Sequence, residues 1–92
     1  MNIYIMVDAE GISGIYDSEQ VMSSMARYNE GRELMVQDIN ACVEACKEAG
    51  VDKIYVRDCH GSGSNVIWSK LSSLADYYIM IVPQKARKYK QI

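Results

Sequence analysis

The chain has 92 residues, of which 49% are hydrophobic and 24% charged, and its net charge is −2 at pH 7. Such a composition is ordinary for a globular domain or part of one, and the net charge gives no attraction to nucleic acid or anionic lipid. The longest apolar run, residues 79–82, is far shorter than the roughly 20 residues of a membrane span. The first residues carry no secretory signal pattern. We therefore expect a cytoplasmic protein with no nucleic-acid or membrane partner.

The first predicted elements are a strand, a long loop and a helix. Residues 3–7 form a short apolar run typical of a strand buried in a parallel sheet. Residues 11–29 are polar and irregular and predict a loop with one helical turn near residues 19–25; loops of this length are usually functional. Apolar residues at helical spacing predict a helix over residues 30–49. Asn29 is a candidate N-cap, and Gly50 is suited to end the helix in the left-handed conformation.

The second half of the chain predicts two more strands. Residues 53–57 form the first, and residues 77–82 form the second, which Pro83 ends. Between them, Ile67, Leu71 and Leu74 have the spacing of a second helix. The order is then β-α-β-α-β. Because crossover connections produce parallel strands, we expect an α/β fold with a three-stranded parallel sheet, the N-terminal part of a larger enzyme.

The C-terminal segment is basic. We assign residues 1–83 to a partial α/β domain and residues 84–92 to a C-terminal tail. The tail has no acidic residue and four cations, which are Lys85, Arg87, Lys88 and Lys90. A basic contact patch is one interpretation, but we expect a solvated terminus.

The three cysteines predict reduced thiols, since their number is odd and no secretory signal precedes them. Cys42 and Cys46 lie four residues apart on the predicted helix. A metal pair is one interpretation, but small buried helix residues are the expected one. Cys59 is an alternative nucleophile, although its side chain should point away from those of Asp58 and His60 if the strand continues.

Polar side chains follow two of the predicted strands. Asp8 and Glu10 come directly after the first strand, and side chains two residues apart in an extended segment share a face. Two adjacent carboxylates repel each other unless a cation or a shared proton relieves them. His60, the one histidine of the sequence, follows the second strand at a similar offset. Parallel strands align their carboxyl ends, so these groups should converge.

Imidazole nitrogen and carboxylate oxygens suit zinc. We therefore predict a metal site formed by Asp8, Glu10 and His60. Asp58 is expected to orient the loop or the imidazole without binding the metal itself. Each residue also has a structural explanation as a capping or solvated group. The glycine-bearing segment HGSGSN, residues 60–65, is an alternative anion site or a simple helix-capping turn.

Three segments carry a family resemblance. The opening IYIMVDAEGISGIYD, the segment YNEGRELMVQDINACVEACKEAG and the loop VRDCHGSGSNV resemble the corresponding segments of the zinc-dependent D-aminopeptidases of the bacterial dipeptide-operon type, in the same order. The resemblance covers about residues 3–76. It implies a dinuclear zinc enzyme that releases D-amino acids from the N-terminus of short peptides and assembles into rings.

The resemblance implies roles for particular residues. Asp8 matches a carboxylate that bridges the two metals, and Glu10 and His60 match two further ligands. The family's remaining ligands and its proposed catalytic histidine have no counterpart here, because the sequence has no second histidine and its last acidic residue is Asp76. Catalytic residues are therefore not assigned.

We accordingly expect a truncated product or a fragment that binds at most one zinc ion and hydrolyses little. The alternative is a non-catalytic remnant or an oligomerising interaction module, since the exposed edges of a small sheet invite pairing.

Overall fold

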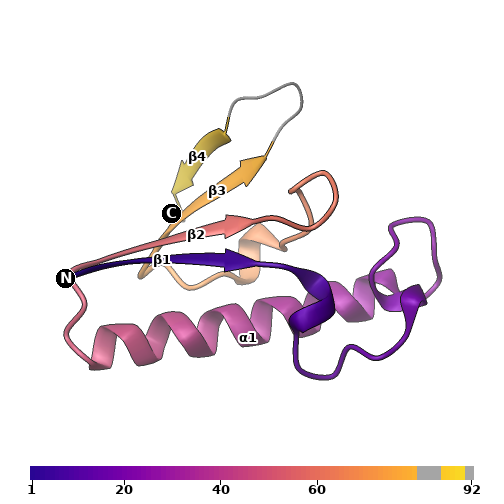
Figure 1. Cartoon of the computed structure of the whole chain (residues 1–92), viewed down its shortest axis with the longest axis horizontal. Helices are drawn as coiled ribbons and strands as arrows, with labels where there is room; N and C mark the ends of the chain where they lie inside the picture. Colours follow the sequence, from indigo (N-terminus) through magenta and orange to yellow (C-terminus); the bar gives the residue numbers. More distant parts are fainter. Residues whose placement is uncertain (81–85, 91–92) are drawn as a thin grey trace.

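The computed structural model describes residues 1–80 and 86–90. The sheet has the order β1-β2-β3-β4, in which β1, β2 and β3 are parallel and β4 pairs with β3 in the antiparallel sense (Figure 1). The three parallel strands confirm the predicted α/β fold. The elements in chain order are β1 (Asn2–Val7), the 3₁₀ turns η1 (Ala9–Gly11) and η2 (Ser18–Gln20), α1 (Tyr28–Glu48), β2 (Lys53–Asp58), the 3₁₀ turn η3 (Trp68–Lys70), β3 (Asp76–Met80) and β4 (Ala86–Lys90).

Helix α1 covers one face of the sheet (Figure 1). It begins two residues before the predicted start, and Arg27 rather than Asn29 is its N-cap residue. Gly50 follows the helix with φ of 89°, as the left-handed end predicts. The buried stripe of α1 packs against the inward residues of the strands. Its members are Met35, Val36, Ile39 and Val43.

The predicted second helix is wrong, because the connection from β2 to β3 contains only the short turn η3. Side chains of α1 bind the backbone of this connection. The side-chain amide of Asn40 donates to the carbonyl of Lys70 at 2.8 Å, and its oxygen accepts the N–H of Ser72 at 2.7 Å. Leu74, expected on the buried stripe, is exposed. Backbone groups held in this way are not available to a helical hydrogen-bond ladder.

Residues 86–90, expected to belong to a solvated terminus, form strand β4. Their register places Tyr89 opposite Tyr77 and Lys88 opposite Tyr78. A fourth strand supplies partners for backbone groups that β3 would otherwise leave unpaired at its edge. Residues 81–85 and 91–92, which include Pro83 and parts of the predicted third strand and tail, lie outside the described residues.

The cysteines are free thiols. Cys46 packs against the core, as expected, whereas Cys42 is exposed, so its predicted burial is wrong. Among the described residues, no helix has the length and apolar character needed to cross a membrane.

Candidate functional site

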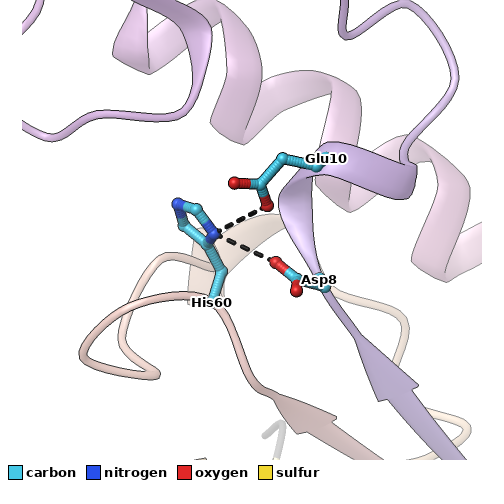
Figure 2. Close-up of side chains that lie close together, drawn as sticks. All are labelled: Asp8, Glu10 and His60. Atoms are coloured by element: carbon cyan, nitrogen blue, oxygen red, sulfur yellow. Dashed lines mark hydrogen bonds and ion pairs between the residues drawn. The ribbon is translucent and has the colours of Figure 1, made fainter. Parts of the chain in front are cut away.

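Asp8, Glu10 and His60 converge at the carboxyl ends of β1 and β2. Nδ1 of His60 lies 3.1 Å from a carboxylate oxygen of Asp8 and 3.2 Å from one of Glu10 (Figure 2). One ligand atom from each residue lies within 4.8 Å of the others. The imidazole is 15% exposed, whereas the two carboxylates are 67% and 64% exposed. The imidazole is therefore mostly buried, whereas the two carboxylates face solvent.

Strand register explains the convergence. Asp8 is the first residue after β1, and Glu10 follows two residues later, in η1. Val7 pairs with Asp58 in the parallel ladder, and the N–H of Cys59 extends that ladder by donating to the carbonyl of Val7 at 2.8 Å. The residue after Cys59 therefore lies beside the residues that leave β1. The expected meeting of His60 with the two carboxylates follows from this pairing.

Asp58 is buried and holds the loop that carries His60. One carboxylate oxygen accepts the N–H of His60 at 3.2 Å and the side-chain amide of Asn65 at 3.1 Å. The other accepts the N–H groups of Asn65 and Val66 at 2.5 and 3.0 Å. Only 2% of Asp58 is exposed, so a carboxylate here requires these donors. Asp58 thus binds the backbone of His60 rather than its imidazole.

Within the loop between Asp58 and Val66, the N–H groups of Asn65 and Val66 donate to Asp58 and are not available to an external anion. The expected helix does not follow it either. Asn65 does not cap a helix; its side chain donates to Asp58 and to the carbonyl of His60 at 2.5 Å. The helix-cap interpretation of residues 60–65 is therefore wrong, and the anion-site interpretation stays a prediction that lacks the N–H groups of Asn65 and Val66.

Sequence patterns missed the contact that orients the imidazole. Nε2 of His60 lies 2.6 Å from the backbone carbonyl of Val21, which can only accept, so Nε2 carries the proton. Nδ1 is the nitrogen that faces Asp8 and Glu10. A backbone carbonyl can belong to any residue type, so no sequence pattern marks it. Only the length of the predicted loop, residues 11–29, indicated that this segment has a functional role.

The segment before Val21 is anchored by a buried amide. Gln20 accepts the N–H groups of Tyr16 and Asp17 at 2.8 and 2.9 Å and donates to Glu30 at 2.6 Å. Its backbone touches α1 at Gly31, where a Cβ atom would lie 1.9 Å from the carbonyl oxygen of Gln20. Only glycine allows this approach. The position of the Val21 carbonyl therefore depends on α1.

The surroundings shift the pKa values of the cluster. Burial opposes the charging of His60, but the Val21 carbonyl, the Asp8 hydrogen bond and the charges of Glu10 and Asp8 outweigh it and raise the pKa of the imidazole. The hydrogen bond with Glu10, followed by that with His60, lowers the pKa of Asp8. Both shifts favour the charged form of the group concerned, the imidazolium of His60 and the carboxylate of Asp8.

The donor set fits a divalent zinc ion, which favours imidazole nitrogen and carboxylate oxygen. Three protein ligands with open positions also match the number in catalytic zinc sites. A depression of about 340 Å³ adjoins Glu10 and Val21 and is lined by Ile15, Tyr16 and Asp17 as well. Cys59 is not part of the cluster; its thiol lies 3.7 Å from the carbonyl of Arg57.

Known proteins are similar to this chain in sequence and in fold. A family model described as D-aminopeptidase matches residues 1–89. A D-aminopeptidase of Bacillus subtilis (strain 168) is 36% identical over 76 residues, which cover 83% of this chain and 28% of the relative. A solved structure of a zinc-dependent D-aminopeptidase, DppA, from Bacillus subtilis, described as a self-compartmentalizing protease, matches with a TM-score of 0.86 and 34% identity.

The structural match covers 89% of this chain and 30% of DppA, so the chain spans less than a third of the length of either protein. The family model spans residues 1–89, a range that contains Asp8, Glu10 and His60. The chain belongs to the D-aminopeptidase family.

Proposed function

We propose that this chain provides one half of a zinc centre of the D-aminopeptidase type, with Asp8, Glu10 and His60 as ligands. The observation that carries the proposal is the placement of His60 Nδ1 within 3.1 and 3.2 Å of two exposed carboxylates. Like charges gathered around one nitrogen are favourable only with a proton or a cation between them. The same three side chains would bind a zinc ion in place of that proton.

The chain's own residues have distinct roles in this proposal. Asp8, Glu10 and His60 would hold the metal, and the family resemblance makes Asp8 the candidate ligand shared by two metals. Asp58 fixes the backbone of His60, and the carbonyl of Val21 fixes its ring. A bound zinc ion supplies Lewis-acid polarisation of a peptide carbonyl and activates water at neutral pH.

The substrate class follows from the family: short peptides with an N-terminal D-amino acid. The depression beside Glu10 and Val21 adjoins the cluster and has room for a substrate side chain. Completion of a dinuclear site requires ligands from outside this sequence, in the same polypeptide or another. We infer that the 92 residues by themselves bind at most one zinc ion and hydrolyse peptides little.

The first test is the zinc content of the purified chain, with thermal melts before and after chelation. We expect about one zinc ion per chain and a lower melting temperature after chelation, because binding to the folded state alone stabilises it. His60→Ala should lose most of the zinc affinity. Glu44→Gln, which removes an exposed carboxylate from α1, is the matched control and should retain it. Unchanged affinity in His60→Ala would reject the assignment.

A second candidate function is an oligomerising module without catalysis. The open outer edge of β1 favours it, since the described strands leave β1 with a neighbour on one side only. A folded oligomer that forms equally well without zinc and shows no zinc affinity would support this alternative.

A further inference from the structure

Asn65 is a buried amide whose oxygen and nitrogen both have partners. Its side-chain NH2 group donates to the carboxylate of Asp58 at 3.1 Å and to the carbonyl of His60 at 2.5 Å, and its side-chain oxygen accepts the hydroxyl of Tyr28. Carboxylate and carbonyl oxygens accept but do not donate, so these two contacts fix which end of the amide faces the loop. Among side chains, only an amide combines two donors and an acceptor in one planar group.

His60 is held through the peptide groups on both sides of it. Its N–H donates to Asp58 at 3.2 Å, and its carbonyl accepts both the amide of Asn65 and the N–H of Gly63, the latter at 2.8 Å. The two peptide planes that flank a residue determine the direction of its Cα–Cβ bond, because only φ and ψ rotate freely between them. These contacts therefore aim the imidazole of His60 at the two carboxylates of the cluster.

Tyr28 and Arg32, at the start of helix α1, hold Asn65 from outside the loop. The hydroxyl of Tyr28 binds the side chain of Asn65, and Nε of Arg32 donates to its backbone carbonyl at 2.7 Å. The guanidinium carbon of Arg32 lies 5.8 Å from the centre of the Tyr28 ring, within the range of a cation–π contact. Burial raises the pKa of Tyr28 against the opposing charge of Arg32, so the hydroxyl stays protonated and remains a donor. The orientation of the Asn65 amide thus depends on α1.

The same part of α1 supports the imidazole by a second route. Gln20 donates to Glu30 at 2.6 Å, and the carbonyl of the next residue, Val21, accepts Nε2 of His60. One end of a single helix therefore supports the backbone of His60, through Asn65, and its ring, through Val21. Because a helix is rigid over such a short span, the two supports keep a constant relation to each other.

We propose that Asn65 is a positioning residue for His60 and that Tyr28 sets the orientation of the Asn65 amide. The inference rests on the proposed zinc site, in which His60 Nδ1 is a ligand. Without the Tyr28 hydroxyl, the oxygen of the amide loses its donor. The amide is then free to rotate, and a rotated amide places its oxygen against the carbonyl of His60. Repulsion between the two oxygens would release the turn and disperse the directions of the imidazole.

The central test compares Tyr28→Phe with Tyr77→Phe. Each variant loses one hydroxyl donor and keeps its ring, but Tyr77 binds the carbonyl of Ser72, outside the His60 loop. Zinc titration should show an affinity about fivefold lower in Tyr28→Phe, the equivalent of one lost hydrogen bond, and an unchanged affinity in Tyr77→Phe. Tyr77 is the more buried of the two, so its variant should lose at least as much stability in urea unfolding. A merely structural effect would then appear in both variants.

Asn65→Asp provides the stronger perturbation. It keeps the shape of the side chain but places an oxygen where the NH2 group faces Asp58 and the carbonyl of His60. Zinc affinity should fall about tenfold or more, as for other residues that orient a ligand. Circular dichroism shows whether this variant folds, and Tyr28→Phe decides the question if it does not.

Two spectroscopic measurements follow the geometry directly. The absorption spectrum of bound cobalt(II), which depends on the arrangement of its ligands, should change in Tyr28→Phe and not in Tyr77→Phe. His60 is the one histidine of the sequence, so its imidazole NMR signals report its position in the metal-free chain as well. These signals should shift in Tyr28→Phe and Asn65→Asp and stay in place in Tyr77→Phe.

Either of two results would overturn the inference. One is a Tyr28→Phe variant with the zinc affinity and imidazole signals of the unsubstituted chain. The other is an equal loss of affinity in Tyr28→Phe and Tyr77→Phe, which would assign the effect to stability alone. If the unsubstituted chain binds no zinc, the proposed zinc site fails, and the metal-free imidazole signals decide separately: a shift in Tyr28→Phe supports the positioning role, and no shift rejects it.

Discussion

His60 and Val21 are joined by a hydrogen bond of 2.6 Å between the imidazole Nε2 and a backbone carbonyl 39 positions earlier. This contact sets the tautomer, because the carbonyl accepts only from a protonated Nε2. It leaves Nδ1 toward Asp8 and Glu10. Histidine ligands commonly donate their second nitrogen to such an acceptor, which fixes the ring and strengthens the ligand. The loop of residues 11–29 thus takes part in the site.

Gly31→Ala should displace that loop. The new Cβ would lie 1.9 Å from the carbonyl oxygen of Gln20, adjacent to Val21, so the backbone must move. We expect a loss of about 1–3 kcal/mol in the free energy of unfolding, typical of overpacking. Zinc affinity should fall as well, because the acceptor for His60 shifts. Urea unfolding and zinc titration measure the two effects.

The control for Gly31→Ala is Gln37→Ala, at an exposed position of the same helix. It should leave both the free energy of unfolding and the zinc affinity close to those of the unsubstituted chain. If Gly31→Ala destabilises the fold but binds zinc normally, then the position of Val21 does not matter to the site.

Asp58→Asn tests the support of the His60 loop. The carboxylate accepts four hydrogen bonds while buried, and an amide places a donor against N–H groups. We expect a loss of roughly 2–4 kcal/mol in the free energy of unfolding, as for other buried charged groups that lose their partners. Zinc affinity should also decrease. Chemical denaturation and calorimetric titration provide the measurements.

Asp52→Asn is the matched substitution at an exposed aspartate, whose partner is the N-terminal ammonium at 2.6 Å. Surface pairs of this kind contribute about 0–1 kcal/mol. An Asp58→Asn variant as stable as Asp52→Asn would show that the loop does not depend on the buried carboxylate.

Zinc affinity should depend on pH through His60. The Val21 carbonyl, Asp8 and Glu10 raise the pKa of the imidazole despite its burial, so protons compete with zinc at higher pH than for a free histidine. Below that raised pKa, affinity should fall about tenfold for each pH unit, as one proton is displaced per zinc ion. Zinc titrations from neutral to mildly acidic pH would show the slope. A flat profile would exclude His60 Nδ1 as a ligand.

Alkaline stability should depend on Tyr77. Its hydroxyl donates to the carbonyl of Ser72 at 2.5 Å, and burial raises the pKa of Tyr77 to about 12. The pKa of tyrosine is about 10 in an unfolded chain. The protonated Tyr77 hydroxyl therefore makes its full contribution to the free energy of unfolding below pH ~10, and this contribution is lost as pH rises toward the folded pKa. Tyr77→Phe has no hydroxyl to titrate. At neutral pH its free energy of unfolding should be lower by about 1 kcal/mol, because the hydrogen bond is absent.

The measurement compares urea unfolding at neutral and alkaline pH. The advantage of the unsubstituted chain over Tyr77→Phe should shrink as pH rises above 10. Tyr4→Phe, at an exposed strand position, should track the unsubstituted chain at both pH values. A constant gap between the two chains would show that Tyr77 does not titrate with unfolding.

Local patterns predicted the elements whose causes are local. The apolar run before Asp8, the helical stripe through Ile39 and the glycine at Gly50 depend on side-chain periodicity or on one backbone conformation, and all three elements formed as predicted. The predicted burial of the first strand is wrong, because Tyr4 and Met6 on one of its faces are exposed. The convergence of Asp8 and Glu10 with His60 was predictable for a related reason. Parallel strands of similar length end at one edge of the sheet, so the residues that follow them must be neighbours.

The errors have a common cause. The apolar spacing of Ile67, Leu71 and Leu74 is compatible with a helix, but Asn40 of α1 binds the backbone of that segment instead. Strand β4 forms because β3 offers it an edge, not because its own residues have a strand pattern. In both cases a partner distant in the sequence satisfies backbone groups whose conformation local preference leaves undecided.

The sequence by itself thus determined the three parallel strands, the main helix and the set of residues that meet at the sheet edge. The tertiary structure alone decided how that set is held: Asp58 by its buried donors, His60 by the carbonyl of Val21, and the Val21 segment by the contact of Gln20 with Gly31. These contacts join residues far apart in the chain, and several use backbone atoms that every residue shares. Periodicity and residue type carry no record of such contacts, so only the folded chain reveals them.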